Sequence, residues 1–220
     1  MNFADRISKH MDAMSSIFQP GLNWQNTIPI DLSGSNREFD GLSEGEWDGA
    51  IERKISDARA IAAVGGYLED RQVYRDKPNF VGEEDRSVHI GVDVFMPADT
   101  ALFAPLNARV HCITNRPTSG DYGPVIVLRH ELEGLAFHTL YGHLSMDTLN
   151  GLKAGQTVTA GDRIGAIGAR PTNGDWPPHL HFQVIIDLQE LDDNYPGVAR
   201  PSDLDFYRQN CPDPMPFLVR

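Results

Sequence analysis

The stretch Pro178-His179-Leu180-His181-Phe182-Gln183-Val184 places two histidines two positions apart, followed by apolar and β-branched residues. This pattern predicts a strand that begins near His179. Side chains alternate across a strand, so His179 and His181 would project from one face and Leu180 would point into the core. Two imidazoles on one strand face suit a metal site, or a metal ligand beside a proton-transfer group. For this stretch alone, the alternative is a pair of histidines at the rim of a strand.

The sequence around this stretch predicts a mainly β domain. From residue 87 helical spacing disappears, and short β-rich runs alternate with turn residues. Together with the helices expected before it, the fold class is α+β, with an antiparallel β-sheet or sandwich core. The predicted strands cover residues 88–95, 101–104, 108–113, 125–130, 136–143, 157–158, 164–167 and 179–186.

We expect three parts along the chain: a helical N-terminal extension over residues 1–84, the β domain over residues 85–210, and a C-terminal tail over residues 211–220. Apolar side chains at helical spacing predict a first helix over residues 1–18. Residues 20–42 are rich in Gly, Asn, Ser and Pro, which predicts a surface loop.

A second helix is predicted from its capping signals. Ser43 and Glu46 have the spacing of a capping box, and Gly65-Gly66 is expected to end the helix. Its apolar face would consist of Trp47, Ile51, Ile55, Ala58 and Ala62.

Composition narrows the classes of partner. The chain has 220 residues and a formal charge of −12, which argues against a nucleic-acid partner because phosphates require a basic patch. No apolar run approaches the roughly 20 residues of a membrane span. Residues 1–10 lack the apolar segment of a signal peptide, so we expect a cytoplasmic location; the alternative is export by a route that does not use such a segment. Cys112 and Cys211 are expected to remain thiols, and nothing in the sequence indicates an oligomeric state.

Upstream, His89-Ile90-Gly91-Val92-Asp93 supplies one imidazole and one carboxylate. In a flat strand their Cα atoms would be about 13 Å apart, almost too far to share an ion. The residues between them favour a strand over a helix. A shared site therefore requires the chain to curl at Gly91, because glycine tolerates unusual dihedrals. Taken alone, the pentad also fits an ordinary surface-facing His and Asp.

A further histidine lies in Leu140-Tyr141-Gly142-His143-Leu144-Ser145, at the end of a predicted strand. Strand alternation predicts that His143 shares a face with Tyr141 and that His138 points the other way. A histidine beside a glycine at a strand end is well placed to line a cleft. The alternative is a rim histidine without a function.

Four motifs in this order resemble the lysostaphin/LytM-type zinc metallopeptidase domain, over roughly residues 85–187. They are His-x-Gly-x-Asp from residue 89, Tyr-x-His-Leu-Ser from residue 141, Gly-Leu-Lys-Ala-Gly-Gln-Thr-Val-Thr-Ala-Gly-Asp-Arg-Ile-Gly-Ala-Ile-Gly from residue 151, and Pro-His-Leu-His-Phe from residue 178. The resemblance implies that His89, Asp93 and His181 bind Zn²⁺ and that His143 and His179 are catalytic.

The chemistry of these residue types agrees with the implied activity. Two neutral imidazoles and one carboxylate leave a zinc site with a net charge of about +1, which polarises an amide carbonyl and lowers the pKa of bound water towards ~7. His130-Glu131 begins like a His-Glu-x-x-His motif, but Gly134 stands where the second histidine would be. A histidine is therefore the expected general base, and either His143 or His179 fits it.

The function expected from the resemblance is that of a zinc metalloendopeptidase. The family's usual substrate, peptide cross-links of peptidoglycan, makes a peptide or muropeptide the expected substrate. One alternative is a non-catalytic LytM-type regulatory or binding module. Another is a carrier-like β domain, because the run from Gly155 to Ile164 also resembles hairpins of lipoyl-type and sugar phosphocarrier domains.

Overall fold

The computed structural model describes residues 3–74, 77–82, 84–191 and 193–219. The helices are α1 (Phe3–His10), α2 (Glu44–Asp57), α3 (Thr148–Gly151), α4 (Leu204–Asn210) and α5 (Met215–Leu218), with short 3₁₀ turns η1 (Met11–Ala13), η2 (Gln72–Tyr74) and η3 (Pro201–Asp203). The strands are β1 (Thr27–Ile30), β2 (Ala62–Gly65), β3 (Glu69–Asp70), β4 (Val88–His89), β5 (Val92–Phe95), β6 (Ala101–Phe103), β7 (Ala108–Arg116), β8 (Gly123–Leu132), β9 (Leu135–Gly142), β10 (Thr157–Val158), β11 (Arg163–Ala166), β12 (His179–Ile185) and β13 (Val198–Ala199).

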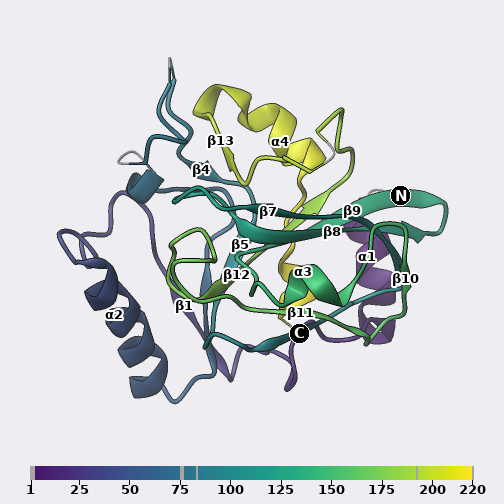
Figure 1. The fold of residues 1–220 in the computed structure, drawn as a ribbon, viewed down its shortest axis with the longest axis horizontal. Helices are drawn as coiled ribbons and strands as arrows, with labels where there is room; N and C mark the ends of the chain where they lie inside the picture. Colours follow the sequence, from purple (N-terminus) through teal and green to yellow (C-terminus); the bar gives the residue numbers. More distant parts are fainter. Residues whose placement is uncertain (1–2, 75–76, 83, 192, 220) are drawn as a thin grey trace.

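One large sheet dominates the fold. Within the described residues it has eight strands in the order β1-β2-β5-β12-β9-β8-β7-β10. Only β1 and β2 run parallel among these neighbours. Two smaller sheets have the orders β13-β4-β3 and β11-β6, and the long strands β7, β8 and β9 cross the middle and right of Figure 1. The mainly β fold with helices in the N-terminal part is therefore confirmed.

The two faces of the sheet differ because side chains alternate along its central strands. In β12, Leu180 and Phe182 are fully buried in the largest hydrophobic cluster, together with Val92 and Val94 of β5. The predicted inward direction of Leu180 is thus confirmed. The intervening side chains of both strands, which include the two histidines of β12, face the opposite side.

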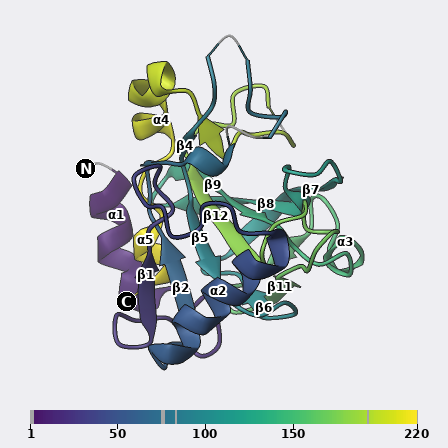
Figure 2. The ribbon, with the colours of Figure 1, turned by 90° about the vertical axis from the view of Figure 1, so that its left-hand side faces the viewer.

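Helix α2 covers the second face of the sheet at its β1 end. Its residues Trp47, Ile51 and Ile55 share a hydrophobic cluster with Ala63 of β2 and Phe95 of β5. Figure 2 shows α2 in front of β1, β2 and β5, whereas α1 and α5 lie at the other side. The helix begins with the predicted capping box between Ser43 and Glu46.

The N-terminal part differs from the predictions in three places. The first α-helix ends at His10 instead of continuing to residue 18. The predicted loop 20–42 contains strand β1, because Ile30 buries its side chain beside α2. The second helix ends at Asp57, and the following residues 62–65 form strand β2 instead. The sequence continues the helical spacing of apolar residues past Asp57 because Ala58 and Ala62 fit it, and alanine is compatible with a helix or a strand. Pairing within the sheet makes residues 62–65 a strand.

The predicted C-terminal tail is also wrong, because residues 211–219 pack against the core. Cys211 is fully buried, and Phe217, Leu218 and Val219 are 4% exposed or less. Phe217 contacts the rings of Phe137 and Phe182, so this segment closes the first face of the large sheet.

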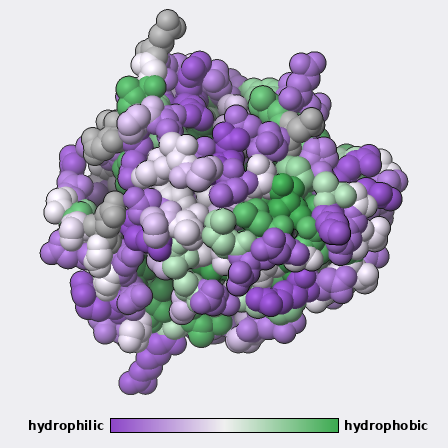
Figure 3. Space-filling view, in the orientation of Figure 1, coloured by the Kyte–Doolittle hydropathy of each residue, from purple (hydrophilic) through white to green (hydrophobic). Residues whose placement is uncertain are grey.

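On the face drawn in Figure 3, hydrophilic residues surround smaller hydrophobic areas. In the part of the chain that the structure describes, there is no helix with the length and apolar character needed to cross a membrane.

Candidate metal centre

Three predicted ligands meet at the junction of two sheets. His89 lies in β4 of the three-stranded sheet, and Asp93 lies in β5 of the large sheet. The chain bends at Gly91 between them, as predicted. His181 pairs with Asp93 across β12 and β5. A Cβ at Gly91 would lie 2.7 Å from Cε1 of His181, so glycine is needed here for close approach.

The donor atoms of the three side chains form a small triangle. Nε2 of His89 lies 2.8 Å from Nδ1 of His181, and Oδ1 of Asp93 lies 3.2 Å from each of these nitrogens. The three residues are at most 3% exposed. Zinc bonds of about 2.0–2.1 Å hold tetrahedral donors about 3.3 Å apart, so the triangle needs to open only slightly to accept the ion.

The outer nitrogens of the two histidine ligands are also oriented. Nε2 of His181 lies 3.0 Å from the amide oxygen of Gln183, which accepts its hydrogen. Nδ1 of His89 faces the carbonyl oxygen of Gly66 at 3.5 Å. These contacts leave the inward nitrogens with their lone pairs, as metal ligation requires. The donor set therefore fits a divalent metal ion.

Two further histidines stand beside the triangle. The rings of His143 and His179 have centroids 4.3 Å apart, and Nε2 of His179 lies 3.7 Å from Oδ1 of Asp93. Nδ1 of His143 donates to the carbonyl oxygen of Asn173 at 2.8 Å, and Nδ1 of His179 donates to that of Pro177 at 2.6 Å. Each neutral ring thus keeps a lone pair on Nε2.

The predicted direction of His143 is wrong in detail. Strand β9 ends at Gly142, and His143 has a φ of +62°, so the alternation stops before it. Tyr141 packs in the core against Phe182, whereas His143 turns to Tyr122 and the other site histidines. This left-handed backbone conformation is uncommon for a residue with a side chain. It brings His143 into the site where a continuing strand would not.

Burial and charge set the protonation states. Burial lowers the pKa of His89 to about 3, and the Arg71 guanidinium acts in the same direction. Burial also lowers the pKa of His143 and His179. For Asp93 burial acts to raise the pKa, but the electrostatic interactions with His89 and with the Arg71 guanidinium hold it well below its usual value. Neutral imidazoles and an ionised carboxylate are the forms that bind metal ions.

The sequence alone did not indicate Arg71, which is 2% exposed. Its NH1 lies 2.5 Å from Oδ2 of Asp93, and its Nε lies 2.7 Å from Oε2 of Glu69. The signal available was an arginine between the polar residues Asp70 and Gln72, just after β3, which does not single out a site residue.

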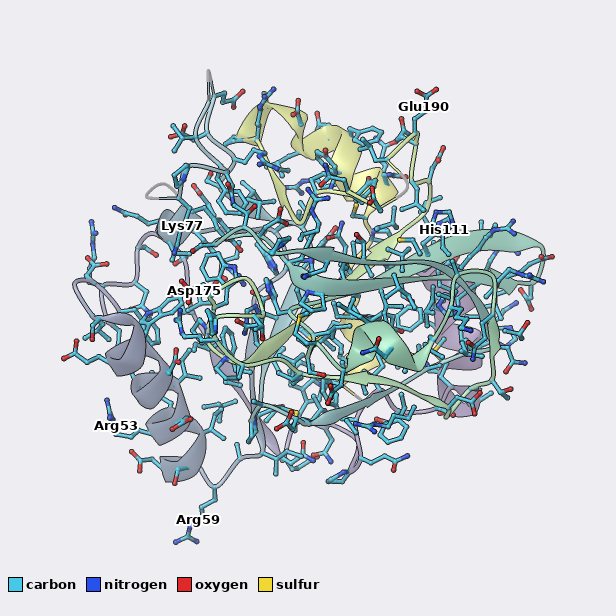
Figure 4. All side chains as sticks on the ribbon, in the orientation of Figure 1. Arg53, Arg59, Lys77, His111, Asp175 and Glu190 are labelled. Atoms are coloured by element: carbon cyan, nitrogen blue, oxygen red, sulfur yellow. The ribbon has the colours of Figure 1, made fainter. Side chains whose placement is uncertain are left out.

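A cleft of about 440 Å³ opens onto the five site residues. Trp176 forms part of its wall, together with Trp47 and Tyr74 from the N-terminal extension. An adjoining cavity of about 460 Å³ shares both tryptophans and extends to Lys77 and Asp175, which Figure 4 labels near one another. The extension therefore lines the cleft.

The remaining histidines lie elsewhere. His130 is 2% exposed and bonds to the carbonyl oxygen of Asn107 and the hydroxyl of Thr139. His111 and His138 contact one another with ring centroids 5.3 Å apart. These contacts place the three rings apart from the candidate metal centre.

The fold and the His-Asp-His site together define a mainly β domain with a donor set that fits a metal ion. Residues 87–193 match the model of Peptidase family M23. This match over about half of the chain confirms the resemblance to lysostaphin/LytM-type peptidases. No curated protein matches the sequence.

Several solved structures are similar to this chain. LytU is 24% identical over 70% of this chain and 90% of its own, with a TM-score of 0.42. The catalytic domain of lysostaphin from Staphylococcus simulans is 23% identical over 59% of this chain and 86% of its own, with a TM-score of 0.38. A zinc-containing peptidase from Vibrio cholerae is 28% identical over 44% of this chain, which spans only 27% of that protein, with a TM-score of 0.34.

Proposed function

We propose that the chain is a zinc-dependent metallopeptidase that hydrolyses peptide bonds. The observation that carries this proposal is the triangle of His89, Asp93 and His181 donor atoms beside two histidines with free Nε2 lone pairs. The M23 family match over residues 87–193 supports the same activity.

In this proposal the two groups of residues have separate functions. His89, Asp93 and His181 hold zinc, which when bound polarises the scissile carbonyl and acidifies water. His143 and His179 lie beside this donor set. In the proposal, the Nε2 lone pair of one of them takes the proton of the attacking water and returns it to the leaving amine. The other would donate a hydrogen bond to the developing oxyanion in its doubly protonated form. The carbonyl oxygens of Asn173 and Pro177 keep both rings oriented for this exchange.

We propose peptide cross-links of peptidoglycan, or soluble muropeptides derived from them, as the substrate. The family match supports this class. The cleft of about 440 Å³ opens onto the site, and aromatic rings from both parts of the chain form its walls.

The test combines zinc analysis with a substrate panel. Purified protein is assayed for bound zinc and for turnover of cell walls, soluble muropeptides and oligoglycine peptides. We expect about one zinc per chain and a loss of about 10²–10⁴-fold in turnover for His143→Ala. His10→Ala is the matched control, because His10 pairs with Glu133 at the surface. Wild-type protein that takes up no zinc, or turnover that survives His181→Ala, would exclude the proposal.

The second candidate is a metal-binding LytM-type module without catalysis. The burial of the site favours it, because all five site residues are at most 6% exposed and substrate must enter through the cleft. Stoichiometric zinc without turnover of any panel member would support this candidate over the peptidase.

A further inference from the structure

We propose that Arg71, which lies outside the segment matched to the peptidase family, is the positioning residue for the metal ligand Asp93. This proposal rests on the zinc site proposed above. It assigns part of the site's construction to the N-terminal extension.

The contacts of Arg71 connect the extension directly to the ligand. Its guanidinium donates from NH1 to Oδ2 of Asp93 at 2.5 Å and from Nε to Oε2 of Glu69 at 2.7 Å. NH1 also donates to the hydroxyl of Tyr74 at 3.1 Å. Oε1 of Glu69 accepts a hydrogen bond from the backbone nitrogen of Leu32 at 3.0 Å. The position of Asp93 is thus tied to two segments of the extension, residues 69–74 and the chain at Leu32.

The geometry of this pair determines which oxygen faces the metal. Because Oδ2 is held by Arg71, only Oδ1 faces the inward nitrogens of His89 and His181. Without the arginine, the carboxylate would be able to rotate about its terminal bond, for which the preference is broad. Arg71 therefore holds Asp93 as a ligand through one oxygen.

The charges explain why Glu69 is needed as well. A guanidinium in contact with a metal ligand places a positive charge near the ion, and in a buried site this repulsion is only weakly screened. Glu69 balances that charge from the far side of the guanidinium, and its side chain is 11% exposed. Arg71 can then orient Asp93 at little electrostatic cost to the ion.

Packing leaves the guanidinium little freedom. Arg71 is 2% exposed, and a Cβ added at Gly65 would lie 2.9 Å from its NH2. In the described part of the chain, this NH2 is a buried atom without a hydrogen-bond partner. The three hydrogen bonds to Glu69, Tyr74 and Asp93 therefore hold the guanidinium of Arg71 in an orientation that leaves its NH2 unsatisfied.

The experiment compares zinc affinity, by competition with a chelator, among the full-length wild type, Arg71→Met, Arg71→Lys and Glu69→Gln. Arg116→Met is the matched control, because Arg116 lines the same cleft but pairs with Asp121. The visible spectrum of the Co²⁺-loaded proteins reports the ligand geometry, and thermal melting of the metal-free proteins reports folding. Glu69→Gln preserves the side-chain volume and carries the test if Arg71→Met does not fold.

Positioning by Arg71 predicts zinc binding weakened by about 10–100-fold in Arg71→Met and a changed Co²⁺ spectrum. Zinc binding by Arg71→Lys should also be weakened, because a lysine ammonium lacks the planar guanidinium that bonds to the carboxylates of Glu69 and Asp93 at the same time. Arg116→Met should match the wild type in both measurements. Unchanged or tighter zinc binding by Arg71→Met would overturn the inference, since removal of a nearby cation alone favours the ion. A wild type that binds no zinc would instead overturn the proposed function.

Discussion

An alanine at Gly91 is expected to disrupt the metal centre. The added Cβ would lie 2.7 Å from Cε1 of His181, 2.8 Å from the carbonyl oxygen of Phe182 and 2.9 Å from Nε2 of His181. Ordinary carbon contacts are about 3.5–4.0 Å, so each of these distances is too short by roughly 0.6 Å or more. The carbonyl belongs to a central strand, and the imidazole is held by Gln183. Forced displacement in such a packed interior costs about 1–3 kcal/mol.

The assay measures urea unfolding and zinc content of Gly91→Ala against the wild type. Gly45→Ala is the control, because a Cβ at this position in α2 meets no atom within 4 Å. Alanine there should leave zinc content unchanged and stabilise the helix by up to about 1 kcal/mol. If Gly91→Ala kept wild-type stability and one zinc per chain, the close approach of the bend to His181 would not be a requirement of the site.

Three other predictions concern the histidines and the metal. His181→Ala should lose zinc, whereas His179→Ala should retain zinc and lose turnover; equal zinc loss in both, measured by elemental analysis, would contradict the assigned division. Burial lowers the pKa of His130 from 6.5 to about 4 in the folded protein. As the pH falls, His130 is therefore protonated in the unfolded chain before it is protonated in the folded chain. The free energy of unfolding should then decrease by about 1.4 kcal/mol per pH unit between pH 6.5 and 4, and urea titrations of His130→Gln should lack this component. Chelation of zinc should lower the melting temperature, because zinc at 100 times its Kd adds about 2.7 kcal/mol of stability.

The sequence predicted the β domain better than the N-terminal part. Seven of the eight predicted strands each correspond to one strand of the structure, since turn residues bound each of them. The predicted strand over residues 88–95 is divided at Gly91 into β4 and β5, which lie in different sheets. The sequence did not predict β1, β2, β3 and β13, because each is at most four residues long and offers little alternation to recognise. Ala62 and Ala63 become strand residues only through their pairing with β1 and β5.

The site residues were predicted as a set, and the structure brings them together. The functions of His89, Asp93, His143, His179 and His181 as ligands or catalysts remain predictions. They were identified from four short motifs that follow one another in the order found in lysostaphin/LytM-type peptidases. Arg71 was not indicated, since its function depends on a partner 22 positions away.

Local covalent spacing determined that His179 and His181 share one strand face and that Leu180 enters the core, because alternation requires no partner. Tertiary structure decided the rest. His89 meets His181 across 92 positions only because the chain bends at Gly91 between two sheets. His143 enters the site only because the strand ends at Gly142 and the backbone turns to a φ of +62°. Contacts of this kind arise from the packing of distant segments, which no local pattern encodes.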